Sequence, residues 1–168
     1  YRPLPTDRLG DYIYYYDSFN KVYGYVGTDE DIVIPVINND PIEIHTLGNN
    51  RHIRNVTLND KVWSVDYSAF KGCKNLENIF VDPDNEYFSS IDGVLFDKAG
   101  TTLLVYPLGR KQTEYHIPEG TLDVFERAFD IGENHVLINK IELGATGMLI
   151  YKLESGSFTD TKQMILLE

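Results

Sequence analysis

The sequence predicts a mostly β solenoid, in which a short strand recurs in each repeat of the chain. The first observation is a phrase that occurs twice, "SAFKGCKNLENIFV" at 68–81 and "RAFDIGENHVLINKIEL" at 127–143. Each copy begins with Ala-Phe, continues through a polar turn and ends in apolar residues spaced like Leu76, Ile79 and Val81. A unit that recurs within one chain indicates architecture, whereas an active site would occur once.

The second observation is a regular period. The last apolar residues of successive units are Ile34, Leu58 and Val81, which are 24 and 23 residues apart. A period of about 20–29 residues with an L-x-x-L-x-L core is the signature of a leucine-rich repeat. We therefore expect a leucine-rich-repeat solenoid of about five units, because no single unit can bury its inward face alone. The expected inward pairs are Ile32/Ile34, Val56/Leu58, Ile79/Val81, Tyr115/Ile117 and Ile141/Leu143, with 156–167 as a worn last copy.

Two segments depart from the period. Within 88–109, two apolar runs flank "DKAGTT", which predicts an inserted β-hairpin at about 89–108. Residues 1–23 are rich in tyrosine, and we expect them to form a β-hairpin or edge strand that caps the first repeat. The alternative for these tyrosines is an aromatic platform for a sugar. The expected organisation is one structural domain, with a cap over 1–23 and repeats over 24–168.

The charge balance excludes two classes of partner. The chain has 26 acidic and 15 basic residues and a formal charge of −11, which repels phosphate backbones and anionic lipid headgroups. We therefore expect no nucleic-acid partner, and the lack of a long apolar run predicts no membrane insertion within this fragment. The sequence begins at Tyr1 without a basic and apolar leader, so we expect a processed or trimmed fragment, with any export signal outside it.

The single cysteine, Cys73, could be a nucleophile, a metal ligand or a small packed residue. Three residues after the repeat phenylalanine stand Cys73, Gly132 and Thr161 in successive copies. A catalytic thiol is not interchangeable with glycine within one chain, but a small residue at a tight turn is, and free cysteine is commonly buried. We therefore expect Cys73 to pack behind Phe70, and both Phe70 and Phe129 to lie inside the convex half of the core.

Other groups of residues give only weak signals of a metal site or a catalytic site. Asp82, Asp84 and Glu86 alternate in a way that could touch calcium, but the loop lacks the glycine and distal glutamate of an EF-hand, which favours a solvated turn. The histidines lack metal-ligand spacing; they are His45, His52, His116 and His135. No acid, base and nucleophile set recurs or clusters. The sequence therefore predicts no catalytic residue, no metal and no cofactor, and a protein that is not an enzyme.

Four stretches of the sequence share a further pattern: "YVGTDEDIVIP", "SAFKGCKNLENIFVD", "NEYFSSIDGVLFDKAGTTLLVYP" and "YHIPEG" followed by "RAF". Together they resemble the BspA-like leucine-rich repeat proteins of host-associated bacteria. The resemblance covers about residues 24–143 and implies an exported or cell-surface protein whose role is adhesion or ligand binding. It also implies a right-handed curved solenoid, with a parallel sheet on the concave face and short turns or helical pieces on the convex side.

The alternation of the repeat strands places a candidate binding site on the concave face. Residues one position from the inward anchors face outward, and Phe80 is a large apolar side chain where the pattern predicts solvent. The candidate ligand-binding residues are Phe80, Thr57, Asn78, His116 and Glu114, and the outward rows also include Val33, Asp31, Asn55, Lys140 and Glu142. The alternative is that the inserted hairpin covers Phe80.

The sequence supports two possible functions, which belong to different functional classes. The first is a non-enzymatic adhesion module at the bacterial cell surface that recognises a host protein or glycan through the concave face. The second is a passive structural spacer or assembly domain of a larger surface protein. The sequence does not specify the ligand.

Overall fold

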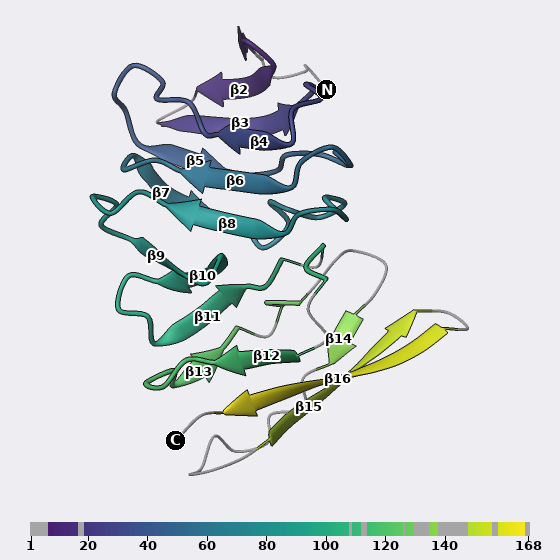
Figure 1. Ribbon diagram of the computed structural model, residues 1–168. Coiled ribbons are helices and arrows are strands. Elements are labelled where there is room, and N and C mark those ends of the chain that lie inside the picture. Colours follow the sequence, from purple (N-terminus) through teal and green to yellow (C-terminus); the bar gives the residue numbers. More distant parts are fainter. Residues whose placement is uncertain are drawn as a thin grey trace.

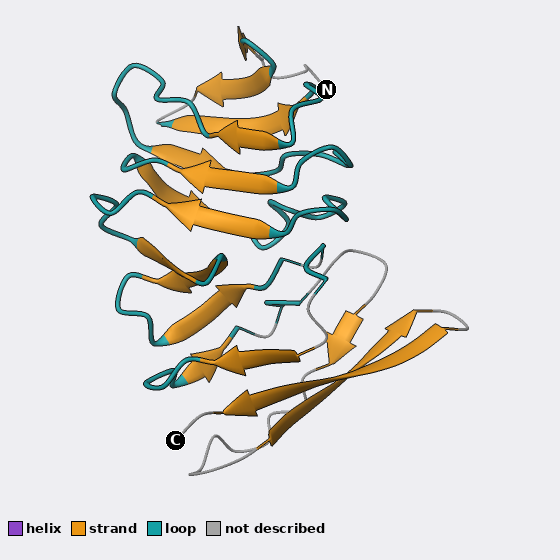
Figure 2. Cartoon of the chain, in the orientation of Figure 1, coloured by secondary structure: helices purple, strands orange, loops and turns teal. Residues whose placement is uncertain are grey.

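The computed structural model describes residues 7–16, 19–107, 109–111, 114–125, 127–129, 135–137, 148–155 and 158–166. Side chains are described for these residues up to Phe129, except those of Glu114 and His116. Every regular element within these ranges is a strand, as Figure 2 shows. The expectation of a mostly β chain is confirmed. The helical pieces expected on the convex side are absent from these ranges, where turns such as that at 67–72 make the connections.

The strands follow one another along the chain as labelled in Figure 1. Within the described ranges they are β1 (Asp7–Leu9), β2 (Tyr12–Tyr16), β3 (Asn20–Tyr25), β4 (Asp31–Val33), β5 (Ile42–Ile44), β6 (Asn55–Leu58), β7 (Val62–Val65), β8 (Asn78–Val81), β9 (Phe88–Ile91), β10 (Val94–Asp97), β11 (Thr102–Val105), β12 (Glu114–Ile117), β13 (Asp123–Val124), β14 (His135–Leu137), β15 (Met148–Ser155) and β16 (Phe158–Leu166).

The first half of the chain winds as a solenoid with two parallel sheets. Strands β4, β6 and β8 pair in parallel, and so do β3, β5 and β7. Each turn in this half therefore supplies one strand to each sheet, and the β-solenoid as a whole has about five turns. The register aligns Leu58 with Val81, the spacing that the sequence predicts. The second parallel sheet is not predicted, because the sequence pattern indicates one strand per repeat.

Antiparallel strands flank and interrupt this parallel arrangement. At the N-terminal end, β1, β2 and β3 pair antiparallel in that order, and β3 then pairs in parallel with β5. The expected boundary between residues 23 and 24 thus falls inside β3. In the middle of the chain, β9, β10 and β11 pair antiparallel, and β13 joins β11 in parallel. Strands β10 and β11 occupy the segment where the sequence predicts the inserted hairpin.

The C-terminal strands differ from the expected worn repeat. Strands β15 and β16 pair antiparallel along their whole length, from Met148 opposite Ile165 to Ser155 opposite Phe158. Strand β16 also pairs in parallel with β12, so a long hairpin stands where 156–167 was expected to form a repeat unit. Consecutive strands joined by a short connection close a small loop at low entropic cost, which favours this local pairing. The expected strand pair Ile141/Leu143 lies outside the described residues.

The predicted core residues are confirmed as buried. The inward anchors of β4, β6, β8 and β12 are buried, apart from the half-buried Val81. Phe70 is 8% exposed and Phe129 is 1% exposed, and they belong to two separate clusters of buried side chains. Because the described residues contain no helix, they include none that could span a membrane.

Cys73 is 4% exposed, and its Sγ lies 3.5 Å from the carbonyl oxygen of Gly48. Burial raises the pKa of the Cys73 thiol to about 11. Since the thiolate is the reactive form, native protein at neutral pH should react with thiol reagents far more slowly than unfolded protein. Labelling with a chromogenic disulfide, with and without denaturant, measures this difference. Equal rates would show that Cys73 is accessible.

Candidate binding face

The outward side of the β4–β6–β8 sheet carries two rows of side chains, which we call the β4–β8 face. The parallel register aligns Asp31, Asn55 and Asn78 in one row, and Val33, Thr57 and Phe80 in the other. Their strand neighbours Ile32, Val56 and Ile79 are buried, so the outward orientation follows from the alternation of a β-strand.

The row of Val33, Thr57 and Phe80 exposes apolar surface. Phe80 is 45% exposed and Val33 is 61% exposed, with the half-buried Thr57 between them. The alternative that the 89–108 segment covers Phe80 is therefore wrong. Parallel strands lie about 4.8 Å apart, so the three side chains form one continuous ledge across the sheet.

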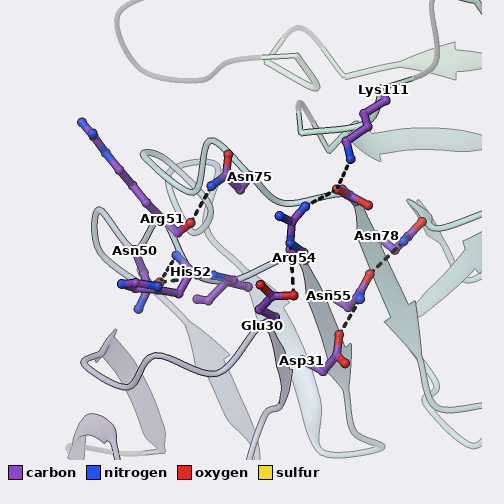
Figure 3. A network of polar contacts seen from close by, with 12 residues as sticks. Glu30, Asp31, Asn50, Arg51, His52, Arg54, Asn55, Asn75, Asn78 and Lys111 are labelled. Carbon is purple, nitrogen blue, oxygen red and sulfur yellow. Dashed lines mark hydrogen bonds and ion pairs between the residues drawn. The ribbon is translucent and has the colours of Figure 1, made fainter.

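The neighbouring row is a hydrogen-bonded ladder, which Figure 3 shows from close by. The Nδ2 of Asn55 donates to Oδ1 of Asp31, and the Nδ2 of Asn78 donates to Oδ1 of Asn55 at 2.8 Å. An Nη1 of Arg110 donates to Oδ1 of Asn78 at 3.2 Å. The ladder thus runs in one direction, from a guanidinium at one end to a carboxylate at the other. Charged ends strengthen such a chain and fix the orientation of both amides.

Arg110 anchors the ladder although its own side chain is only 5% exposed. Besides Asn78, it donates to the backbone oxygen of Asp92 at 2.7 Å, to Oδ2 of Asp92 at 3.0 Å and to the backbone oxygen of Glu77 at 3.2 Å. Gly93 makes room for this contact. It has a φ of 73°, and a Cβ there would lie 2.3 Å from Oδ1 of Asn78 and 2.8 Å from Nη1 of Arg110.

A row of ion pairs runs beside the ladder, at the residues that precede the strands. Arg54 bridges Glu30, at 3.2 Å from its Nε, and Glu77, at 2.7 Å from its Nη1 (Figure 3). Lys111 lies 4.0 Å from the same oxygen of Glu77. The hydrogen bonds from Arg54 to Glu77 and Glu30 raise the pKa of the guanidinium. Successive turns of the solenoid are thus linked side chain to side chain along this edge.

The structure brings together three of the five candidate residues. Thr57, Asn78 and Phe80 lie on the β4–β8 face. Glu114 and His116 belong to β12, in a different sheet in which they pair with Gln163 and Ile165 of β16. Their side chains are not among those described, and the outward residues Lys140 and Glu142 lie outside the described ranges.

The separation of β12 from β8 has a local cause. On β8, the backbone nitrogen of Ile79 donates to the oxygen of Gly93 at 2.8 Å, and the hydroxyl of Ser90 donates to the oxygen of Ile79 at 2.6 Å. The β9–β10 segment therefore occupies the edge where the next repeat strand would pair. The parallel β4–β6–β8 sheet ends at three strands, and the chain reaches β12 only after β11.

The other polar candidates form no metal site in the described part of the chain, where no cluster of three His, Cys, Asp or Glu residues suits an ion. Asp82 uses its Oδ1 to accept from the backbone nitrogen of Asp84 at 2.9 Å, as in an ordinary Asx turn. His45 lies 3.8 Å from a carboxylate oxygen of Asp66 and 4.0 Å from one of Glu43, with its ring against that of Tyr23.

Comparison with known proteins adds two partial likenesses. No family model and no curated protein matches the sequence. Among solved structures, a leucine-rich repeat protein from Eubacterium ventriosum aligns with 23% identity and a TM-score of 0.48, over 62% of this chain and 28% of that chain. The pneumococcal vaccine antigen PcpA aligns with 13% identity and a TM-score of 0.31, over 75% of this chain and 62% of that chain. This chain spans less than two thirds of either protein. The fold described above rests on the strand pairing of this chain itself.

Proposed function

We propose that this chain is a non-enzymatic binding module at the bacterial cell surface, which recognises a host protein or glycan through the β4–β8 face. The observation that carries the proposal is the exposed ledge of Val33, Thr57 and Phe80 beside an oriented amide ladder. We propose in addition that the chain is a BspA-like leucine-rich repeat protein, with a cap over 1–23 and an inserted hairpin at about 89–108. No nucleic acid is expected as partner of a chain with a formal charge of −11.

The apolar row supports binding because exposed aromatic side chains on rigid strands are suitable anchors. An anchor contributes most when it is held in place before the ligand arrives, since less side-chain entropy is lost on binding. Phe80 fulfils this condition, because its strand pairs with β6 and its neighbour Ile79 is fully buried. A sugar ring or an apolar peptide side chain could cover the Phe80 ring.

The polar row supports binding because its amides are oriented and retain hydrogen-bonding capacity. An Asn side chain has two N–H donors and an oxygen with two lone pairs. Within the ladder, Asn55 uses one donor toward Asp31 and one lone pair for Asn78. One donor and one lone pair of Asn55 thus remain for a hydroxyl or a peptide group. This combination of an aromatic ring and fixed amides suits a glycan or an extended peptide.

The second candidate is a passive spacer or assembly domain of a larger surface protein. The ion-pair row of Glu30, Arg54 and Glu77 favours it, because these groups satisfy one another and tie successive turns together without needing a ligand. A spacer would require no anchor on the β4–β8 face. The two candidates therefore differ in what happens when Phe80 is removed.

A glycan and extracellular-matrix array on the purified domain identifies a ligand, and Phe80→Ala then tests the face. We expect the variant to weaken binding at least about tenfold, a change of about 1.4 kcal/mol, because the anchor's contact area is lost. The matched control is Leu122→Ala, which removes another exposed apolar side chain, 72% exposed, away from this face. Titration calorimetry measures affinity, and thermal unfolding checks that both variants fold. Unchanged affinity for a confirmed ligand in the folded Phe80 variant would favour the spacer.

A further inference from the structure

A cleft of about 330 Å³ lies on the other parallel sheet, where the turn after β6 meets the loop after β8. This volume is near the lower end of the range for small-ligand sites. Six of the lining residues matter here: Asp60, Lys61, Trp63, Asp84, Glu86 and Tyr87. None of them belongs to the β4–β8 face, so the cleft is a separate feature of the molecule.

Two aromatic rings line the cleft. Trp63 is 36% exposed and Tyr87 is 50% exposed. The Trp63 ring is held edge-to-face by Phe19, with ring centroids 5.1 Å apart and an interplanar angle of 90°. Both rings therefore expose surface to solvent while at least Trp63 is fixed by packing.

Nearby aromatic rings already bind cations of the protein itself. Lys21 Nζ lies 4.8 Å from the centroid of Phe19, and the Arg127 guanidinium lies 4.4 Å from that of Tyr67. Among the described side chains, no cation lies over the rings of Trp63 or Tyr87. Cation–π attraction is strongest for tryptophan, so the cleft offers the best ring of this surface to a cation from outside.

The charges lining the cleft are unbalanced. Three carboxylates face one ammonium, and the Lys61 Nζ is 2.7 Å from an oxygen of Asp60. Asp60 raises the pKa of Lys61 most, and Glu86 contributes a smaller effect, so both lie within electrostatic reach of it. Asp84 and Glu86 form no ion pair with a described side chain, although the Lys98 ammonium lies on the same loop, where it donates to the backbone oxygens of Pro83 and Asn85. A carboxylate beside an aromatic face attracts a cation by both Coulomb and quadrupole terms.

The loop that carries Tyr87 is fixed from beneath by Asn85, which is fully buried. The Nδ2 of Asn85 donates to the backbone oxygens of Asn59 and Val62, both at 2.8 Å. Its Oδ1 accepts from the backbone nitrogens of Tyr87 and Phe88, both at 2.8 Å. Two walls of the cleft are thus joined through one side chain, and the cleft is formed before any ligand binds.

We propose that this cleft binds a cationic side chain, a lysine ammonium or an arginine guanidinium, of a basic polypeptide segment. The ring faces of Trp63 and Tyr87 contact the cation, and the carboxylates of Asp84 and Glu86 pair with it. A neutral sugar could stack on the same rings but would gain nothing from the unbalanced charge. The cleft is independent of the proposed function, because it shares no residue with the β4–β8 face.

The only tryptophan of the sequence lies in the cleft, which makes its fluorescence a direct reporter. The experiment titrates the protein with acetyl-(Lys)₃-amide and follows Trp63 emission, with acetyl-(Gln)₃-amide and methyl glucoside as neutral probes at the same ionic strength. We expect a saturable change with the lysine peptide alone, which weakens as salt is added. The double variant Asp84→Asn/Glu86→Gln should raise the dissociation constant at least about tenfold. Tyr87→Leu should also weaken binding.

A matched control separates the cleft from the overall negative charge. The double variant Asp7→Asn/Glu119→Gln removes the same charges at exposed positions outside the cleft, and should change the dissociation constant less than about twofold. Equal weakening in the two double variants would mean non-specific attraction and would overturn the proposal. So would the lack of a saturable signal with the lysine peptide, or an equal response to methyl glucoside. None of these outcomes bears on the Phe80 test of the β4–β8 face.

Discussion

Replacing Asn85 by alanine is expected to lower the free energy of unfolding by about 3–5 kcal/mol, a large part of the stability of an ordinary domain. The side chain is fully buried and makes four hydrogen bonds, all to backbone groups. Alanine leaves two carbonyls and two N–H groups without these partners, and each buried polar group left unpaired costs about 1–3 kcal/mol. The expected loss lies at the lower end of the range for four such penalties, because the Asn59 oxygen still accepts from the Val62 nitrogen at 3.3 Å and water can satisfy some of the other groups.

Urea denaturation followed by Trp63 fluorescence measures this loss. The matched control is Asn75→Ala, because Asn75 is exposed and makes one hydrogen bond, from its Nδ2 to the backbone oxygen of Arg51. The control should cost less than about 1 kcal/mol. Asn85→Asp, which keeps the acceptor oxygens but turns a charge toward two carbonyls, should be about as destabilising as Asn85→Ala. If Asn85→Ala cost no more than Asn75→Ala, Asn85 would not join the two turns.

The register of the β4–β6–β8 sheet could be predicted from the sequence, because it depends on a period that the chain repeats. The spacing from Leu58 to Val81 appears directly as a cross-strand pair. Burial of Ile79 and exposure of Phe80 then follow from strand alternation. Phe70 and Cys73 were predictable for the same reason, since the turn around them is part of the repeated unit.

The second parallel sheet could not be predicted in the same way. Its strands β5 and β7 are three and four residues long, like those of the β4–β6–β8 sheet, but they lie outside the L-x-x-L-x-L core whose recurrence predicts that sheet. Trp63 is exposed at one of these positions, so the hydrophobic pattern there is also misleading. The long β15–β16 hairpin could not be predicted either, because isolated apolar residues such as Phe158 resemble a worn copy of the repeat.

The polar residues that position the β4–β8 face and the cleft differ in how well the sequence predicts them. Arg110 contacts Asn78 across 32 residues of sequence, and that contact depends on where the chain returns after the β9–β11 segment. No local pattern indicates it. Asn59 and Asn85 carry a weak signal, because each follows a repeat strand by a few residues. Asn59 donates to the oxygen of Ile34 at 2.7 Å, as Asn85 does to that of Asn59, so successive turns are joined in the same way.

Replacing Arg110 by methionine is expected to lower the free energy of unfolding by about 2–4 kcal/mol. Methionine retains part of the apolar stem, but it removes every donor and the guanidinium, whose central carbon lies 5.8 Å from the centroid of the Tyr106 ring. The backbone oxygens of Glu77 and Asp92 and the Oδ1 of Asn78 then lose their guanidinium partner. The ion pair with Asp92 adds little, since that carboxylate is 67% exposed and screened by water.

The neighbouring Lys111→Met is the matched control, because it removes the same charge from a side chain that is 84% exposed and 4.0 Å from Glu77. It should change stability by less than about 0.5 kcal/mol. Urea denaturation of both variants gives the comparison, and equal losses would show that Arg110 acts only through its charge.

The amide ladder adds a second measurement, by NMR, because loss of Arg110 frees the Asn78 amide to rotate. The side-chain amide signals of Asn78 and Asn55 should therefore shift in the Arg110 variant while those of Asn85 stay in place. Unchanged amide signals at Asn78 would mean that Arg110 does not orient the β4–β8 face.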